Sequence, residues 1–290
     1  MTRMHADEVD TDVPLVRRLL EAQFPEWSEL ALEPVSSFGT DNALYRLGAD
    51  MVVRLPRIDW AVGAAERDFR WLPVLAPRLQ VEIPQPLALG IPGEGYPWAW
   101  GVYSWIEGED ARDSGVDPDD LARFVRSLRE LDLPDGPPAG RGAPLRTRDA
   151  ATRAAISELE GEIDVRAATA AWAAALEVPD WPGPPTWVHG DLLAGNLLLR
   201  NGRLTGVIDW SGVGVGDPAA DLIGAWSLFE ARERSTFRAA VDVDDRTWAR
   251  GRGLALSQGL VALPYYNETN PILAGIGRRA IANVLASLDG

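Results

Sequence analysis

The stretch that decides the fold runs from Val188 to Trp210 and reads VHGDLLAGNLLLRNGRLTGVIDW. Its apolar runs, around WVHGD, LLLRNGRL and TGVIDW, predict three short strands, and NG at 201–202 is a hairpin turn signal. Asp191 follows the first strand, Asn196 comes five residues later, and Asp209 ends the last strand. The pattern therefore predicts a strand, loop and hairpin frame that carries three side chains with oxygen atoms.

These three side chains are of the types that phosphoryl transfer needs. This reaction requires little covalent chemistry from the protein. The protein supplies a carboxylate that orients and deprotonates a hydroxyl, and oxygen ligands for magnesium on the phosphates. Asp and Asn also shape turns, and that interpretation is favoured for Asp191 or Asn196 taken alone. Their order with Asp209 on one frame favours catalysis.

The stretch resembles the signature of the aminoglycoside phosphotransferase family, antibiotic kinases with a protein-kinase-like fold. The matching residues are His189-Gly190-Asp191, Asn196 and Ile208-Asp209-Trp210, followed by Gly216-Asp217-Pro218 and Asp221. The resemblance implies that Asp191 is the catalytic base and that Asn196 and Asp209 hold magnesium. It implies that His189 shapes the catalytic loop, and a packed, hydrogen-bonded histidine is favoured over direct proton transfer.

The N-terminal half carries a candidate phosphate-binding cation. A kinase fold needs a cation on its third strand and a helix glutamate that positions it. Arg54 in MVVRLPR and Glu66 are the candidates, and alternation with Val53 and Leu55 puts Arg54 on the opposite face of its strand. Arg57, expected to be exposed, is the competing cation. Many family members have Lys here, whereas the macrolide-phosphorylating branch is similar to this chain in having Arg, which changes the geometry of the phosphate grip but not its sign.

Two further segments are expected to bind the nucleotide. The loop SSFGTDN, residues 36–42, has one glycine and by itself is typical of an ordinary hairpin turn, but its position before Arg54 favours a phosphate-covering loop. Its predicted contacts are the backbone amides of Ser37, Phe38, Gly39 and Thr40. Adenine or guanine is expected to bond the backbone of Ser104, Trp105 and Ile106. The sequence does not distinguish ATP from GTP.

The glycine-rich GVGVG, residues 212–216, invites a dinucleotide-binding interpretation. The third glycine of that fingerprint would fall at Asp217, and a second carboxylate beside a pyrophosphate is unfavourable. The segment is instead expected to replace a protein-kinase activation segment. Asp217 and Asp221 are predicted to be structural, bonding backbone groups and capping the helix that starts at Pro218.

Composition excludes several classes of site. The formal net charge of −15 argues against nucleic-acid and membrane-surface binding and favours cationic partners. Cysteine is absent, which excludes disulfides, thiolate nucleophiles and iron–sulfur clusters. All 28 basic residues are Arg, which excludes a Schiff-base or Walker A lysine. With two histidines in the chain, a metal would rest on oxygen ligands, which suits magnesium.

The patterning predicts an α+β, protein-kinase-like fold with two lobes. Residues 1–105 form a β-rich nucleotide-binding lobe, and residues 106–290 form a mainly helical lobe for catalysis and acceptor binding. Helices are predicted over residues 13–24, around 62–72 and over about 150–177, and everything after 218 is expected to be helical. The first of these carries an apolar stripe on one side and has Thr11 or Asp12 as its expected cap. The runs ALYRL and MVVRL, joined by the turn-like residues 48–50, predict a hairpin. The segment LPDGPPAGRGAP is predicted to be a flexible connector.

The late helices form the acceptor site in this family, and their carboxylates bind substrate amines. The resemblance thus implies Glu230 and Glu268 as contacts for a cationic substrate, although each alone is typical of a solvated surface charge. Tyr265 and Tyr266 are the expected contacts for an apolar acceptor such as a macrolide.

The predicted function is magnesium-dependent transfer of the γ-phosphate of ATP or GTP to a hydroxyl of an aminoglycoside-type antibiotic. The alternatives are a macrolide kinase, a kinase of a metabolic sugar or amino alcohol, and a nucleotide-binding pseudokinase without turnover. The N-terminus lacks an apolar signal segment, and no apolar run approaches the roughly 18 residues of a membrane span, so a cytoplasmic location is expected. A monomer or homodimer is expected.

Overall fold

The structure, a computed structural model, describes residues 7–36, 39–133 and 135–288. The chain forms two compact units. The N-terminal unit comprises residues 1–108 and 206–211, and the C-terminal unit comprises residues 109–205 and 212–290. The predicted contacts at Ser37 and Phe38 lie outside the described residues.

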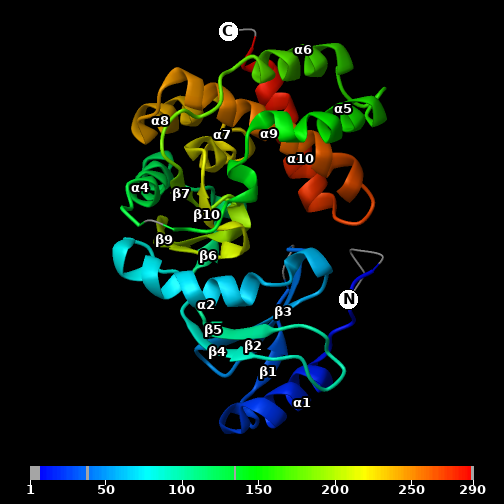
Figure 1. The fold of residues 1–290 in the computed structure, drawn as a ribbon, viewed down its shortest axis with the longest axis vertical. Helices are drawn as coiled ribbons and strands as arrows, with labels where there is room; N and C mark the ends of the chain where they lie inside the picture. The colour runs from blue at the N-terminus through cyan, green and yellow to red at the C-terminus, as the bar shows by residue number, and fades with distance from the viewer. Residues whose placement is uncertain (1–6, 37–38, 134, 289–290) are drawn as a thin grey trace. The chain divides into compact units, whose positions relative to one another are not determined.

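A five-stranded sheet in the order β1-β2-β3-β5-β4 organises the N-terminal unit (Figure 1). All its neighbouring strands are antiparallel. The strands are β1 (Leu32–Pro34), β2 (Asn42–Leu47), β3 (Met51–Pro56), β4 (Pro86–Gly90) and β5 (Trp100–Ser104). The turn at residues 48–50 joins β2 to β3, which confirms the predicted hairpin.

One face of this sheet is covered by α1 (Val13–Gln23), as the helical stripe predicted. Asp12 caps the helix by accepting a hydrogen bond of 2.7 Å from the N–H of Leu15. The buried side chains of α1 join Tyr45, Val53 and Val102 of the sheet in one apolar core. Burial of this stripe holds α1 on the sheet.

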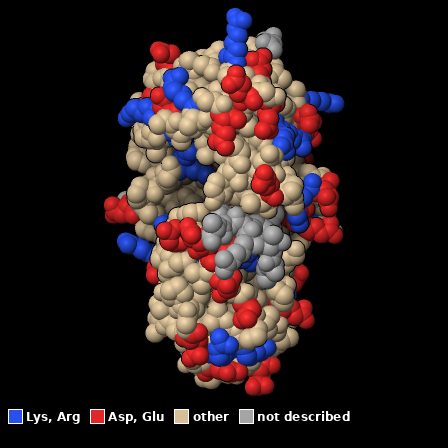
Figure 2. Space-filling view, turned by 90° about the vertical axis from the view of Figure 1, so that its right-hand side faces the viewer, with Lys and Arg blue, Asp and Glu red and all other residues tan. Residues whose placement is uncertain are grey.

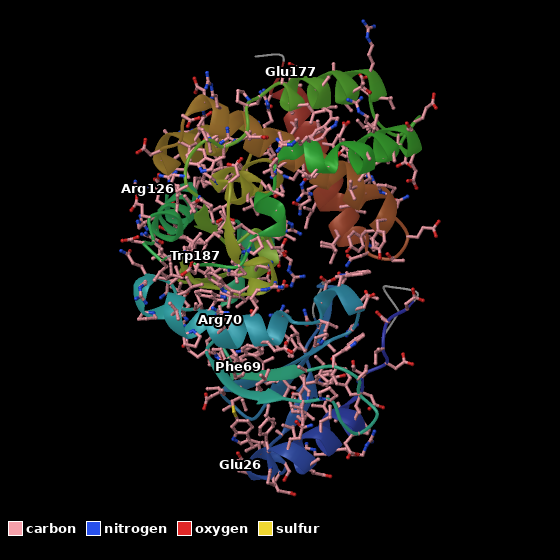
Figure 3. The ribbon with its side chains drawn as sticks, viewed as in Figure 1. Glu26, Phe69, Arg70, Arg126, Glu177 and Trp187 are labelled. Carbon is pink, nitrogen blue, oxygen red and sulfur yellow. The ribbon has the colours of Figure 1, made fainter. Side chains whose placement is uncertain are left out.

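The opposite face carries α2 (Ala64–Leu75). Phe69 of α2, labelled in Figure 3, meets the ring of Tyr103 on β5 edge to face at 5.8 Å. Short 3₁₀ turns at Pro25–Trp27, Asp59–Ala61 and Ala76–Arg78 complete the unit. The segment Gly206–Ser211 joins it through the N–H of Val207, which donates to the carbonyl of Glu82 at 2.9 Å.

The C-terminal unit contains two small sheets. One has the order β6-β8-β9, and the other pairs β7 with β10. Their bounds are β6 (Glu109–Asp110), β7 (Thr186–Val188), β8 (Leu197–Arg200), β9 (Arg203–Val207) and β10 (Gly214–Gly216). Asn201 and Gly202 have φ of +53° and +72°, as the predicted two-residue hairpin turn requires.

Helices make up most of the rest of this unit, and α9 and α10 lie side by side (Figure 1). They are α3 (Ala111–Ser114), α4 (Pro118–Arg129), α5 (Asp149–Glu158), α6 (Val165–Leu176), α7 (Gly224–Ser227), α8 (Ala231–Val241), α9 (Asp245–Tyr266) and α10 (Pro271–Ala286). The 3₁₀ turns are Gly140–Gly142, Leu145–Arg148, Ala194–Asn196, Trp210–Gly212 and Pro218–Leu222. The region after Pro218 is helical, as expected.

The prediction of a single helix over about 150–177 is wrong, because the chain forms α5 and α6 with a break between them. Gly161 in the break has φ of +88°, which a helix cannot contain, and Asp164 caps α6 by accepting from the N–H of Ala167 at 2.9 Å. Among the described residues, no helix has both the length and the apolar character that crossing a membrane requires.

Candidate active site

The loop after β7 holds His189 in the protein interior. The side chain is fully buried, and its ring lies edge to face with Phe124 at 6.5 Å. The N–H of Asp191 donates to His189 Nδ1 at 3.1 Å. These contacts favour the packed-histidine interpretation, in which His189 shapes the loop through the backbone of Asp191.

Asp221 fastens the same loop from the 3₁₀ turn Pro218–Leu222. Its two carboxylate oxygens accept hydrogen bonds from the N–H groups of His189 (2.9 Å) and Gly190 (2.7 Å). Gly190 has φ of +78°, and a Cβ there would lie 3.3 Å from the carbonyl oxygen of Gly212, so the loop favours glycine at this position. Burial raises the pKa of Asp221 to about 6, against the opposing effect of these hydrogen bonds.

Asp217 is structural as well, which confirms the prediction for both residues. It caps the turn by accepting from the N–H of Ala219 at 2.9 Å. Its carboxylate also pairs with Arg250 of α9 through two hydrogen bonds of 2.5 and 3.2 Å. The pair is buried, so Asp217 anchors α9.

The side chain of Asn196 makes two hydrogen bonds to Asp191. Nδ2 of Asn196 donates to the backbone carbonyl of Asp191 at 2.8 Å and to its Oδ2 at 3.2 Å. Asn196 ends the 3₁₀ turn that precedes β8 and is buried, whereas the Asp191 side chain keeps 18% of its surface exposed. Asn196 therefore holds the carboxylate that the sequence predicts as the base, and this carboxylate is partly exposed.

The sequence reasoning missed Arg141, which contacts the predicted base. Its Nη1 donates to the carbonyl of Gly190 and to Oδ1 of Asp191. Arg141 lies in the segment predicted to be a flexible connector, and that prediction is wrong. The segment is tied along β10, where the N–H of Val215 donates to the carbonyl of Pro137 at 2.7 Å. No motif spacing links residues 141 and 191, so the sequence offered no signal for this contact.

In the N-terminal unit, Arg54 lies at the centre of a charged cluster. Its Nη1 donates to Oδ2 of Asp68 at 3.1 Å, and its Nη2 donates to Oδ1 of Asp209 at 2.5 Å. Val53 and Leu55 face the apolar core on the other side of β3, as the alternation predicted. Arg54 and Asp209, assigned separately from sequence, are thus brought together.

The expected pairing of Arg54 with Glu66 is wrong, because Asp68 takes that place. Glu66 lies exposed in the first turn of α2, whereas Asp68 shares the buried face of the helix with Ala64 and Trp71. The two carboxylates are two residues apart, about 200° around a helix, so they point in different directions.

Burial controls the charge of this cluster. It raises the pKa of Asp68 to about 6, although the positive charge of Arg54 opposes the shift. The hydroxyl of Tyr103 donates to Oδ2 of Asp68 at 3.2 Å, and its own pKa is raised by burial and by the Asp68 charge. The pKa of Arg54 is raised, because attraction to Asp209 and Asp68 outweighs the opposing effect of its burial. Arg54 therefore stays charged at any physiological pH.

Asp209 sits at a strained backbone position. Its φ is +58°, in the left-handed region that residues other than glycine seldom adopt, and such positions cluster at functional sites. Oδ1 of Asp209 also accepts a hydrogen bond of 2.9 Å from the hydroxyl of Ser211. The neighbouring Trp210 is fully buried and donates to the carbonyl of Val207 at 2.9 Å.

Arg57, the competing cation, is only 9% exposed, which corrects the expectation that it is exposed. It lies near Tyr45, whose pKa burial raises and the Arg57 charge lowers. Tyr45 belongs to the apolar core, on the side of the sheet that α1 covers. This placement favours Arg54 as the phosphate-binding cation.

Two backbone N–H groups of the segment predicted to bind the nucleotide base already have partners. The N–H of Ser104 donates to the carbonyl of Gln85 at 2.9 Å, and the N–H of Trp105 donates to that of Asp50 at 2.7 Å. The N–H groups of Ser104 and Trp105 are therefore already engaged in backbone hydrogen bonds. Thr40 follows Gly39 in the predicted phosphate-covering loop. It is buried, and its hydroxyl donates to Asp41 at 2.9 Å.

The predicted acceptor residues lie in two places in the C-terminal unit. Glu230 caps α8 and pairs with Arg279 of α10 at 2.8 Å. Tyr265 and Tyr266 end α9 with their rings 4.8 Å apart, and the exposed Glu268 follows them.

Comparison with known proteins gives these residues a context. A model of the family described as the phosphotransferase enzyme family matches residues 32–254. The uncharacterised protein YcbJ of Bacillus subtilis (strain 168) is 27% identical over 274 residues, which cover 86% of this chain and 87% of that protein. Asp191, Asn196 and Asp209 lie inside the matched range.

Solved structures confirm the predicted kinase-like α+β fold. The GDP complex of wild-type aminoglycoside 2'-phosphotransferase-IIIa is similar with a TM-score of 0.72 and 19% identity, covering 96% of this chain and all of that one. Macrolide 2'-phosphotransferase MphH from Brachybacterium faecium is similar with a TM-score of 0.60 and 22% identity, covering 94% and 97%.

Proposed function

The chain belongs to the phosphotransferase enzyme family, and from this membership we propose that it moves the γ-phosphate of ATP or GTP to a hydroxyl of an aminoglycoside-type antibiotic. Asp191 is the base in this proposal. Asn196 and Asp209 are the magnesium ligands, and Arg54 grips the phosphates. The N-terminal unit is the nucleotide-binding part, and the C-terminal unit carries the base and the acceptor site.

The observation that carries the proposal is the fixed carboxylate of Asp191. Arg141 donates to its Oδ1 and Asn196 to its Oδ2, while the backbone of the same loop is held by Asp221. Each carboxylate oxygen has about two acceptor sites, so a substrate hydroxyl can still donate to Asp191. A base held in one orientation is already close to the reactive geometry. Such positioning is a main contribution of the protein to phosphoryl transfer.

The charged cluster in the N-terminal unit supports nucleotide binding. Arg54 presents a permanent positive charge on a strand and is held in place by the buried Asp68. A planar guanidinium can bind phosphate oxygens through two parallel hydrogen bonds. We propose that nucleotide phosphates take over part of the contact that Arg54 makes with Asp209.

Magnesium fits the residues proposed to hold it. Asn196 and Asp209 supply amide and carboxylate oxygens, the donors that magnesium prefers, and the Asp209 side chain is 32% exposed. Among the described residues, no cluster of three His, Asp or Glu forms a site for a metal held by protein alone. Magnesium commonly binds through one or two carboxylates together with substrate phosphates, and it neutralises phosphate charge when bound.

The acceptor is proposed from the late helices and the net charge. Glu230 and Glu268 would attract amines, and Tyr265 and Tyr266 would serve an apolar acceptor. Figure 2 shows acidic side chains spread together with basic ones over one face of the molecule. A macrolide is the second candidate acceptor, supported by the similarity to macrolide 2'-phosphotransferases. A sugar or amino alcohol, and a pseudokinase without turnover, stay alternatives. Roles in antibiotic resistance and a cytoplasmic location stay predictions.

The test is nucleotide consumption by the purified full chain, coupled to a colour change, with ATP and GTP in separate series. The acceptor panel contains aminoglycosides, macrolides and amino alcohols. Asp191→Asn keeps the shape of the side chain and should lower kcat by about 10² to 10⁴. Asp242→Asn is the matched control, because Asp242 is exposed and its φ of +53° suits Asn.

Two outcomes would contradict the proposal. Nucleotide binding without consumption in the presence of any acceptor would support the pseudokinase alternative, and equal turnover by Asp191→Asn would remove this residue as the base. Turnover with amino alcohols alone would reassign the acceptor while leaving phosphotransfer in place.

A further inference from the structure

A cavity of about 320 Å³ opens in the C-terminal unit among α7, α8 and α9. We call it the arginine pocket, and its defining side chains are Arg234, Arg238, Arg252, Trp226 and Trp248. None of these residues belongs to the site proposed for phosphotransfer. Pockets that bind small molecules are commonly of this size or larger.

The lining carries more positive than negative charge. Three guanidinium groups line the pocket with one carboxylate, that of Asp245, so two positive charges remain. Asp245 is almost fully exposed and pairs with Arg238 at 2.7 Å. This concentration of positive charge contrasts with the −15 net charge of the whole chain.

Arg234 is a charged side chain held inside the protein. It is only 9% exposed, and the one hydrogen bond of its side chain to a described residue goes from Nη1 to the carbonyl of Phe229 at 3.3 Å. Burial lowers its pKa, and the nearby Glu230 opposes the shift, but Glu230 itself pairs with Arg279. A buried cation with so few acceptors gains from an anion beside it.

The side chain of Arg252 makes neither a hydrogen bond nor an ion pair with any described residue, and the residue is half-buried. Burial lowers its pKa, and the positive charge of Arg238 lowers it further. The guanidinium of Arg238 lies 5.3 Å from the ring centre of Trp248. Mutual repulsion of these two cations is a cost that a bound anion would remove.

Two tryptophan side chains of the pocket lining lie against each other. Nε1 of Trp226 is buried without a hydrogen-bond partner among the described residues. The Trp226 ring lies 4.8 Å from that of Trp248, so the two indoles form an apolar wall beside the arginines.

We propose that the arginine pocket binds a small, doubly charged oxyanion of the phosphate-monoester class. Phosphate oxygens are acceptors for the guanidinium forks, and two negative charges match the two unbalanced positive charges. The cavity is larger than one inorganic anion, and the indole wall suits the organic part of a monoester. The site is independent of the proposed phosphotransfer.

Isothermal titration calorimetry of the full chain at low salt tests the proposal. Glycerol 3-phosphate and inorganic phosphate are the probes, glycerol is the neutral control, and a dissociation constant of about 1 mM or tighter is expected for glycerol 3-phosphate. Arg252→Gln should weaken it by about tenfold or more. Arg232→Gln, at an exposed arginine of α8 outside the pocket, should leave it unchanged.

Two further measurements separate this site from others. Arg54→Gln should keep the binding, because a probe held at the proposed nucleotide site would be lost in that variant. If Arg252→Gln melts early, Arg238→Gln, at a more exposed side chain, replaces it. Absence of binding heat up to about 10 mM glycerol 3-phosphate would overturn the proposal. An equal loss of affinity in Arg232→Gln and Arg252→Gln, or tighter binding of citrate than of glycerol 3-phosphate, would also overturn it.

Discussion

Arg141 donates from Nη1 to the carboxylate of Asp191, although the two residues are 50 positions apart in the chain. The same nitrogen bonds the carbonyl of Gly190, so one guanidinium ties both the backbone and the side chain of the catalytic loop. Arg141 thus restricts the rotation of the proposed base from a segment that the sequence alone describes as a linker.

Arg141→Gln should lower kcat by about 10- to 100-fold and leave the nucleotide KM near normal, because a base displaced by a fraction of an ångström loses reactive geometry without losing nucleotide contacts. Arg141→Lys should recover part of the loss. Steady-state kinetics with a fixed acceptor measures both values. Arg146→Gln, at an exposed neighbouring arginine, is the control, and an equal fall in that variant would show a general effect of charge.

Asp209→Asn should remove most of the magnesium-dependent tightening of nucleotide binding, because it takes away the carboxylate proposed to bind the metal. The ion pair of Arg54 with Asp68 should keep the cluster folded in this variant. The measurement is the nucleotide dissociation constant with magnesium and with a chelator. Binding by the unchanged chain that is tight and indifferent to magnesium would contradict the assignment.

Asp68 should make nucleotide affinity sensitive to pH near 6. Burial raises its pKa to about 6, so lowering the pH from 7.5 to 5.5 protonates the carboxylate and weakens its hold on Arg54. Affinity should therefore fall over this range. Asp68→Asn should bind more weakly at pH 7.5 and lose most of the dependence. An unchanged pH profile in Asp68→Asn would assign the titration to another group.

The buried Asp120 should stabilise the C-terminal unit. Its oxygens accept from Nε and Nη2 of Arg203 at 2.7 and 2.5 Å and from the N–H of Leu204 at 3.2 Å. Asp120→Asn leaves donors facing an amide nitrogen and should lower the free energy of unfolding by about 1–3 kcal/mol. Denaturant unfolding at pH 7 measures it, with Asp242→Asn as the control.

The contributions of Asp120 and Asp68 to stability depend on pH with opposite signs. The hydrogen bond from Arg203 lowers the pKa of Asp120 to about 2, so its contribution is present above about pH 4 and is lost as the pH falls towards 2. The pKa of Asp68 is raised, so its contribution is present below about pH 4 and is lost as the pH rises through about 6. Asp120→Asn should flatten only the acidic limb of the curve.

Salt should separate the two classes of antibiotic acceptor. Polycationic aminoglycosides should bind more weakly as salt rises, because the Debye length is about 10 Å at 0.1 M and screens the attraction of the acidic chain. A macrolide should depend less on salt and more on Tyr265 and Tyr266. Acceptor KM values at low and high salt, with Glu230→Gln and Glu268→Gln in turn, measure the difference. Absence of polyamine binding at every salt concentration would exclude the aminoglycoside assignment.

Local patterns predicted much of the fold, because each depends on residues close in the chain. The stripe of α1, the hairpin of β2 and β3, and the turn at Asn201 all follow from periodicity and turn chemistry. The sequence left the cap of α1 open between Thr11 and Asp12, and the structure shows Asp12. The prediction of one helix over 150–177 is wrong because the sequence is rich in alanine on both sides of the break at Gly161. Helix propensity is nearly uniform on both sides of that glycine.

The sequence by itself determined the chemistry available to this protein: oxygen ligands, arginines in place of lysine, and the motif that carries Asp191, Asn196 and Asp209. Only the tertiary structure decided which charges meet. It paired Arg54 with Asp68, brought Arg141 to Asp191, and gathered the arginine pocket from α8 and α9. Side-chain spacing along one helix or strand can be read locally, whereas contacts between distant segments depend on which apolar faces bury each other when the chain folds.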